Sequence, residues 1–371
     1  MQDSRTPHRE PSAGNTGAAT ETPGTTLLVH DTLILRGIAV LLIIARHTLG
    51  RAYFNNDSFL RPAYILVHLL SQSAVPLFLV LSGFSLSLGA GKNPRFRKYR
   101  HIALTRILPA YTLWYFTYAI LTGVKHSDNL SVVSLASQFL LLANNGHLWF
   151  LVLLIQLYLL FPLLRRLYTH ALFGRFTVLF VFAVVLVAQP LFESQAALAF
   201  AAPYCARLFS YFTVYFVLGF YLKDYASLFT RYARQPLVIL SGLVFVCAMK
   251  SVEVTQIVSI PLDKYIADAG EIFGVINIFE NTAIFVLLFV LSDWVHARCP
   301  RVEVFLSGYG LYSYGIYLAH VLPMALSYSV LRLFIHADND TVILGNMIAT
   351  MIVARLLVGW LNKLPFSKYY A

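Results

Sequence analysis

The first apolar segment of the chain carries two side chains whose types and spacing could do chemistry. In LRGIAVLLIIARHTLG, residues 35–50, Arg36 and His47 are eleven residues apart. In an α-helix, eleven steps of about 100° return to within roughly 20° of the starting direction and rise about 16.5 Å. The two side chains would therefore share one helix face at different depths. Because a guanidinium binds anions and an imidazole can act as a general base, the pair predicts an anion site linked to a base.

A structural role also explains the same two residues. An ionised side chain at the centre of a bilayer costs about 2.5–3.5 kcal/mol, so an arginine or histidine inside a spanning helix indicates a functional site facing the protein interior. Arg36 could instead extend to the cytoplasmic headgroups, and His47 could form a hydrogen bond inside the bundle. Spacing alone leaves both interpretations open. Arg46 lies about 100° further round the helix, where a structural role is favoured.

Further polar residues lie in or beside later apolar segments. The basic segment GKNPRFRKYRHIALTRILPAY at 91–111 predicts an anion nearby. Attraction to anionic lipid headgroups is a sufficient explanation for its loop portion, but Arg106 lies deeper. The other candidates are single residues in or at the ends of apolar segments: His147, Trp149, Glu280, Tyr317 and His320. Each histidine or glutamate could be catalytic, part of a proton relay or one partner in a buried hydrogen bond, and interfacial anchoring is sufficient for the tryptophan.

The sequence lacks the motifs of soluble catalytic sites. GFSLS at 83–87 lacks the second glycine of a nucleophile elbow, and there is no P-loop, zinc-protease or dinucleotide-binding motif. Cys205, Cys247 and Cys299 are odd in number and lack metal-ligand spacing, so no metal site and no disulfide framework are expected. The net charge of +11 comes from short loops between apolar blocks and does not indicate a nucleic-acid partner.

The composition places these residues in a membrane protein. Of the 371 residues, 58% are hydrophobic and 12% are charged, against roughly 25% charged in a soluble domain. The apolar residues form blocks of about 17–25, the length of a helix that crosses a bilayer. Residues 1–30 are rich in small and polar residues and are expected to form a disordered cytoplasmic tail before a single transmembrane domain, 31–371.

The apolar blocks predict an all-α polytopic membrane protein with about ten transmembrane helices. The predicted spans cover residues 33–50, 66–90, 102–124, 147–164, 176–191, 207–222, 236–249, 272–296, 309–334 and 341–362. The loops on one side of this topology carry 17 Lys and Arg residues, against 5 on the other. Because basic residues in short loops remain in the cytoplasm, both termini are predicted to be cytoplasmic. The short apolar segment 131–143 is expected to be a re-entrant or interfacial helix.

Four segments resemble acyltransferase family three, the multispan membrane O-acyltransferases that include O-acetyltransferases of surface polysaccharides. They are LRGIAVLLIIARH at 35–47, PLFLVLSGFSLSLG at 76–89, RILPAY at 106–111 with HLWFL at 147–151, and SYGIYLAH at 313–320. The resemblance implies an integral protein of a bacterial inner membrane. It also implies transfer of an acyl group, usually acetyl from acetyl-CoA, to a hydroxyl of a surface polysaccharide or lipid-linked glycan.

The resemblance implies roles for individual residues. Arg36 and His47 match the arginine and histidine of the first helix that the family needs for activity. Ser82 and Gly83 match its SGF motif, and Arg106 matches its third-helix arginine.

The chain departs from the family in two places. Where many members have a second arginine three residues before the third-helix arginine, this chain has Ala103, with Arg100 about one turn further away. The glutamates that often follow the tryptophan are replaced by Leu154 and Ile155. Their acidic role is therefore missing or supplied elsewhere, with Glu280 as the candidate.

The predicted mechanism follows from these assignments. The phosphates of acyl-CoA would bind near Arg36 and Arg106, with Arg100 as a further candidate. His47 would act as general base on the acceptor hydroxyl, or as a covalent acyl carrier. Hydrogen-bond donors to the oxyanion could come from three side chains: Ser82, Tyr111 and Tyr317.

The main alternative is a secondary transporter or flippase of an anionic or lipid-linked substrate. Its substrate and proton sites would be the intramembrane charged or titratable residues, namely Arg36, His47, His320 and Glu280. A non-catalytic assembly subunit is a further alternative, but it does not explain why the first span has a polar face. The transporter alternative does not predict the four motif matches in order.

Overall fold

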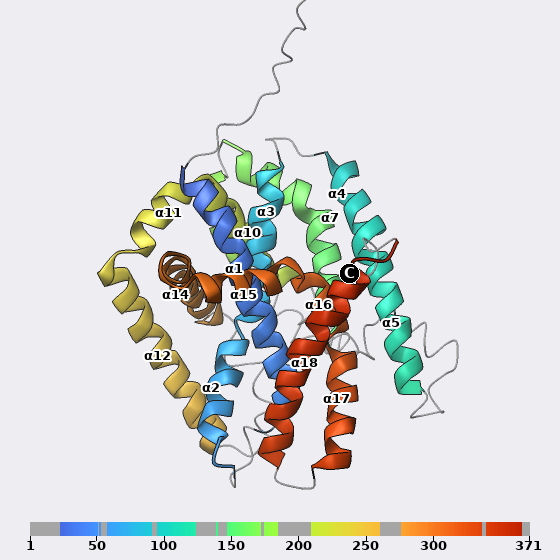
Figure 1. Ribbon diagram of the computed structural model, residues 1–371. Coiled ribbons are helices and arrows are strands. Elements are labelled where there is room, and N and C mark those ends of the chain that lie inside the picture. Colours follow the sequence, from blue (N-terminus) through green and yellow to red (C-terminus); the bar gives the residue numbers. More distant parts are fainter. Residues whose placement is uncertain are drawn as a thin grey trace, which may run out of the picture.

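The computed structural model describes residues 23–50, 52, 58–90, 95–123, 139, 147–171, 174–184, 209–259, 276–335 and 339–365. The regular elements in these ranges are helices, and the ranges contain no strand. Figure 1 shows the helices packed as a bundle with α1 running through its middle. This architecture confirms the predicted all-α class.

The N-terminal half of the bundle contains the elements that carry the first three family-like segments. They are α1 (Pro23–Leu49), α2 (Arg61–Ser71), α3 (Ala74–Leu88), α4 (Phe96–Ile102), the π-helical turn η2 (Ala103–Ile107), α5 (Leu108–Gly123) and α7 (Trp149–Thr169). α4, η2 and α5 follow one another without a break. Arg106 therefore lies in a π-helical turn, a local distortion that is frequent at functional sites.

The C-terminal half begins after the short 3₁₀ turn η4 (Gly174–Phe176) and the helical residues 177–184. Its helices are α10 (Phe209–Asp224), α11 (Ala226–Ala233), α12 (Pro236–Ser259), α14 (Ile276–Arg298), α15 (Pro300–Leu311), α16 (Ser313–Ala319), α17 (Val321–Phe334) and α18 (Asn339–Leu361). α16 and α17 meet at an angle of 53°.

Several of these helices can cross a bilayer. Six of the described helical segments are long and apolar enough, or seven if α16 and α17 form one bent span. The chain is therefore an integral, polytopic membrane protein. The number of about ten spans and the cytoplasmic position of both termini stay predictions.

The element boundaries differ from the predicted ones in several places. α1 begins at Pro23, inside the segment predicted as a tail, while residues 1–22 lie outside the described residues. α12 continues to Ser259 rather than ending at residue 249. The predicted span 309–334 is divided, because turns at Tyr312 and His320 separate α15, α16 and α17. Of the predicted re-entrant segment 131–143, only Phe139 is described, and of the predicted span 176–191 only 176–184.

Two close helix crossings hold the centre of the bundle. At the crossing of α3 and α10, a Cβ on Gly83 would collide with the backbone of Phe216, and one on Gly219 with the backbone of α3. At the crossing of α1 and α15, Gly37 lies against Leu306 and Gly310 against Leu33 in the same way. Figure 1 shows α15 crossing α1 near the middle of the bundle. Small residues let helix backbones approach closely, which is a major source of helix association in membranes.

Replacement of Gly83 by Ala is expected to destabilise the protein by about 1–3 kcal/mol, because the neighbouring atoms are backbone and one helix must shift. Thermal unfolding of the purified protein in detergent measures the loss. Gly242→Ala in α12 is the matched control, since its Cβ would meet only the Leu287 side chain at 3.6 Å. Equal losses in the two variants would show that the α3–α10 contact does not need a glycine.

Candidate active site

Three histidines from distant parts of the sequence lie together inside the bundle. His47 is near the C-terminal end of α1, His147 precedes α7, and His320 lies between α16 and α17. The ring centroids of His47 and His320 are 5.0 Å apart, those of His147 and His320 5.3 Å, and those of His47 and His147 6.3 Å. His147 and His320 are buried, and His47 is half-buried. We call these three residues the histidine cluster.

The tautomer of His320 is fixed by its neighbours. Its Nδ1 lies 2.7 Å from the carbonyl oxygen of Tyr317, and because a carbonyl only accepts hydrogen bonds, Nδ1 must donate. In the neutral ring, Nε2 then carries the lone pair. The Nε2 atoms of His320 and His147 are buried and have no hydrogen-bond partner among the described residues. Since buried polar atoms are normally paired, these two nitrogens are available to a bound group.

Two tyrosines hold the backbone around the histidine cluster. The Tyr317 hydroxyl donates to the carbonyl oxygen of His147. The Tyr118 hydroxyl donates to the carbonyl oxygen of Leu318 at 2.6 Å, and its ring lies 4.8 Å from that of His147. These contacts join α5, α16 and the turn before α7.

The bend between α16 and α17 has an identifiable cause. Pro323 has no backbone N–H to bond the carbonyl of Ala319, and a proline ring inside a helix clashes with the carbonyl four residues earlier. The 53° bend that results lies at His320. Local chain geometry therefore places His320 where the two helices diverge.

A cavity of about 250 Å³ lies beside the histidine cluster and contains both predicted anion-binding arginines. Its lining residues come from α1, α3, α4, η2, α7 and α16, and they are Arg36, Phe78, Ser82, Ile102, Arg106, Ile107, Phe150, Leu154, Tyr158, Ser313, Tyr314 and Tyr317. Tyr158 of α7 lines the same space as the two arginines. We call this space the arginine cavity.

The arginine cavity combines cationic, polar and apolar walls. Arg36 Nη2 donates to Ser85 Oγ at 2.8 Å, which fixes one end of the guanidinium. The buried Tyr314 hydroxyl has no hydrogen-bond partner among the described residues. Apolar walls of Phe78, Phe150 and Ile107 complete the cavity. Such a space can hold an elongated ligand with a negative end, polar groups along its length and an apolar portion.

Tyr317 connects the arginine cavity with the histidine cluster. Its side chain lines the cavity, while its ring centroid lies 6.3 Å from that of His147 and 6.0 Å from that of His320. α1 connects the same two places, because Arg36 lines the cavity and His47 belongs to the cluster. The two α1 side chains thus face the same group of helices, as their spacing predicted.

The other predicted site residues lie in different surroundings. Ser82 lines the arginine cavity, whereas Arg100 is exposed on α4 and is not among the lining residues. The Tyr111 hydroxyl donates to the carbonyl oxygen of Phe139 at 2.9 Å. Trp149 packs against Phe212, with ring centroids 5.3 Å apart. The prediction of Tyr111 as an oxyanion donor therefore gains no support from its contacts.

Glu280 belongs to a separate buried ionic group. Its carboxylate lies 2.8 Å from Lys250 Nζ, and Lys250 also contacts Glu253 at 3.0 Å and Gln72 at 2.9 Å. This arrangement joins α12 to α14 and to the end of α2. Glu280 is thus committed to an ion pair with Lys250, which gives no support to the idea that it replaces the missing glutamates.

Arg46 has the structural surroundings that were expected for it. Its Nη1 lies 3.2 Å from His68 Nδ1 and 3.5 Å from Ser71 Oγ, both in α2. These contacts connect the C-terminal end of α1 to α2, while the neighbouring His47 faces the histidine cluster.

Sequence reasoning missed three tyrosines of the site: Tyr118, Tyr158 and Tyr314. A signal was present for two of them. Tyr314 lies three residues before Tyr317, on the same side of a helix, and Tyr118 follows Trp114 at helical spacing. Tyrosines in apolar helices are common, so their spacing does not distinguish a site from packing.

Comparison with known proteins gives one match. The model of a family described as an acyltransferase domain matches residues 34–361, nearly the whole chain. No curated protein matches the sequence, and no solved structure matches the fold.

Among the described residues, no group of three or more His, Cys, Asp or Glu side chains is placed to hold a metal ion.

Proposed function

The chain belongs to acyltransferase family three, and from this membership we propose that it transfers an acyl group, chiefly acetyl, from acyl-CoA to a hydroxyl of a surface polysaccharide or lipid-linked glycan. The observation that carries the proposal is the junction at Tyr317 between the arginine cavity and the histidine cluster. Because Tyr317 lines the arginine cavity and its ring lies near those of His147 and His320, this junction supports a site with an anion-binding end and a basic end. The proposed location is a bacterial inner membrane.

The donor would enter the arginine cavity. Planar guanidinium groups form bidentate contacts with phosphate, and Arg36 and Arg106 both line this space. The pantetheine arm carries amide groups, which suit the Ser82 and Tyr158 hydroxyls and the unpartnered Tyr314 hydroxyl. The thioester would then lie near Tyr317, beside the histidine cluster.

His47 is the proposed general base. Its imidazole would take the proton of the acceptor hydroxyl while that oxygen attacks the thioester carbonyl. The carbon–sulfur bond breaks as the intermediate collapses, and the thiolate of coenzyme A receives the proton. His147 and His320 present unpartnered Nε2 atoms next to this point, and the lone pair of His320 Nε2 would accept a hydrogen bond from the acceptor hydroxyl.

In a second form of the mechanism, His47 Nε2 or Nδ1 attacks the thioester itself. The acyl group is then carried on the imidazole and passed to the acceptor hydroxyl. Rapid-mixing measurement of coenzyme A release with donor alone separates the two forms, since only the second breaks the thioester before an acceptor binds and gives a burst of one coenzyme A per protein.

The direct test is transfer of label from acetyl-CoA by the purified protein in liposomes that contain a glycan extract. Release of coenzyme A together with label in the glycan supports the proposal. If the protein neither releases coenzyme A nor binds any acyl-CoA but exchanges substrate across the liposome membrane in a counterflow assay, a transporter is the correct function instead.

Arg36→Ala is expected to raise the KM for acyl-CoA by about tenfold to a hundredfold, because a hydrogen bond to a charged group contributes about 1.5–3 kcal/mol. Initial rates over a range of donor concentrations measure the change, and kcat should fall less than KM rises. Arg332→Ala is the matched control, since Arg332 is exposed on α17 and absent from the cavity. An unchanged KM for Arg36→Ala would remove Arg36 from donor binding.

A further inference from the structure

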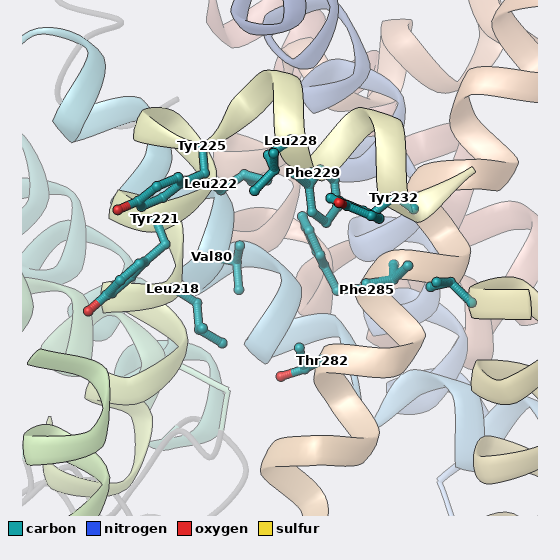
Figure 2. A pocket seen from close by; sticks show the side chains of 13 residues that line it. Val80, Leu218, Tyr221, Leu222, Tyr225, Leu228, Phe229, Tyr232, Thr282 and Phe285 are labelled. Carbon is teal, nitrogen blue, oxygen red and sulfur yellow. The ribbon is translucent and has the colours of Figure 1, made fainter. Parts of the chain in front are cut away.

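An apolar hollow lies on the opposite side of α3 from the arginine cavity. It has a volume of about 400 Å³ and is enclosed by α3, α10, α11, α12 and α14. Figure 2 shows Val80 of α3, Leu218 of α10, Phe229 of α11 and Phe285 of α14 around it. Almost all of its wall is carbon, so it suits a hydrocarbon ligand.

A second hollow continues from the first between α12 and α14. Its volume is about 660 Å³, and it shares Val238, Thr282 and Val286 with the first. The Thr282 hydroxyl donates to the carbonyl of Ile278 at 2.7 Å, so it offers no free donor to a ligand. Because they share these lining residues, the two hollows form one apolar groove along α12 and α14.

α11, which lines one end of this groove, also carries polar and cationic side chains. Arg231 is exposed beside the lining residue Tyr232, and Figure 2 shows the Tyr232 and Tyr225 hydroxyls at the ends of side chains around the hollow. Two neighbouring cations are already paired, Lys223 with Asp224 and Arg234 with Asp293. Among the described residues Arg231 forms no ion pair, which leaves one unpaired positive charge on the exposed side of α11.

α11 has the character of a helix that lies at a membrane surface. Its sequence ASLFTRYA places Leu228, Phe229 and Tyr232 on an apolar side and Arg231 on a polar side. Amphipathic helices with tyrosine and arginine at the boundary lie at the level of lipid headgroups. Residues 223–234, which include α11, also belong to the side predicted to be cytoplasmic. Basic residues on that side are attracted to anionic lipids.

We propose that this groove binds one membrane phospholipid with an anionic headgroup. The acyl chain lies along α12 and α14, and the headgroup phosphate contacts Arg231 at α11. The inference does not depend on the catalytic proposal, because the groove and the arginine cavity lie against different faces of α3.

Lipid titration of the full-length protein, followed by native mass spectrometry, tests the proposal. The probes are phosphatidylglycerol and phosphatidylcholine with identical acyl chains. The expected result is one tightly bound phosphatidylglycerol with at least fivefold higher affinity than phosphatidylcholine. Equal affinity for the two lipids would overturn the anionic assignment.

Two variants locate the site. Val286→Trp fills the shared part of the groove and should weaken phosphatidylglycerol binding at least tenfold, because several methylene groups lose their contacts. Arg231→Gln should weaken it about fivefold, the effect of one basic residue near a charged headgroup. The matched control is Leu326→Trp on α17, which is 59% exposed and outside the groove. Unchanged binding in Val286→Trp would overturn the proposed position.

A photoreactive phosphatidylglycerol crosslinked to the parent protein gives a measurement that does not rely on variants folding. The expected adducts lie on peptides of α11, α12 or α14. Adducts spread evenly over the membrane-facing helices would indicate only surrounding lipid and overturn the proposal. Conversion of a dimer to a monomer by Val286→Trp, without any bound lipid in the parent, would assign the groove to a second copy of the chain.

Discussion

His47→Ala is expected to lower the rate of acyl transfer by about 10²–10⁴-fold, the range attributed to a positioned general base. His47 is the member of the histidine cluster on the same helix as Arg36, and its ring centroid lies 5.0 Å from that of His320. Removal of its imidazole takes the proposed general base away from the histidine cluster and leaves only His147 and His320. Binding of acyl-CoA should persist, since the arginine cavity is untouched.

Label transfer from acetyl-CoA under single-turnover conditions measures this loss. A matched control is His296→Ala, because His296 is exposed at the end of α14 and paired with Glu303 at 3.0 Å. Circular dichroism and donor binding establish that the His47 variant is folded. Full transfer by His47→Ala would exclude both the general-base and the covalent form of the mechanism.

Lys250→Met is expected to destabilise the protein by about 3–5 kcal/mol, the cost of breaking a buried ion pair by removing one partner. Lys250 Nζ lies 2.8 Å from Glu280 and 3.0 Å from Glu253, and those carboxylate side chains are only 2% and 3% exposed. Without the ammonium group, two like charges remain buried together. Methionine is unbranched like lysine and only one heavy atom shorter, so packing changes little.

Thermal unfolding in detergent compares this variant with Lys363→Met, where the lysine is exposed. The triple variant Lys250→Met, Glu253→Gln, Glu280→Gln removes the uncompensated charges and should recover most of the lost stability. No loss in Lys250→Met would mean that the two carboxylates are neutral in the folded protein. Loss without recovery would mean that the ammonium is needed for packing of α12.

Local sequence patterns predicted the positions of some residues of the candidate site. Helical spacing placed Arg36 and His47 on one side of a spanning helix, and their neighbours in the structure agree with it. The depth of Arg106 in its segment also indicated a site residue, and it lines the same cavity as Arg36. These positions could be predicted because they depend on where a residue lies in a single helix or segment, whereas the roles of the three residues stay predictions.

The association of His147 and His320 with His47 could not be predicted from such patterns. The three residues are brought together by tertiary packing and by a bend at Pro323, and neither is encoded by periodicity. Glu280 was a candidate for the same reason as the histidines, being a polar residue in an apolar segment. Its partner Lys250 lay beyond the predicted end of its span, so the ion pair was not visible in the sequence.

Span boundaries failed where two helices follow each other closely. The apolar pattern of a segment is the same whether it forms one straight helix or several. The predicted span 309–334 contains the end of α15 and all of α16 and α17. Gly83 was noted only as part of a motif. The structure gives the physical reason for it, which is the close approach of the Phe216 backbone.

The continuous helix α1 has a consequence for the choice of donor. It is a single helix from Pro23 to Leu49, and Arg36 and His47 are held apart by a rise of about 16.5 Å. Under the proposed function, this fixed rise sets the length of the arm that can extend from phosphates near Arg36 to a thioester near His47. A short thioester such as acetyl-N-acetylcysteamine can lie near Arg36 or near His47, but it cannot extend to both at once. Selection by length would disfavour acyl thioesters that lack the full arm, without any contact to the acyl group itself.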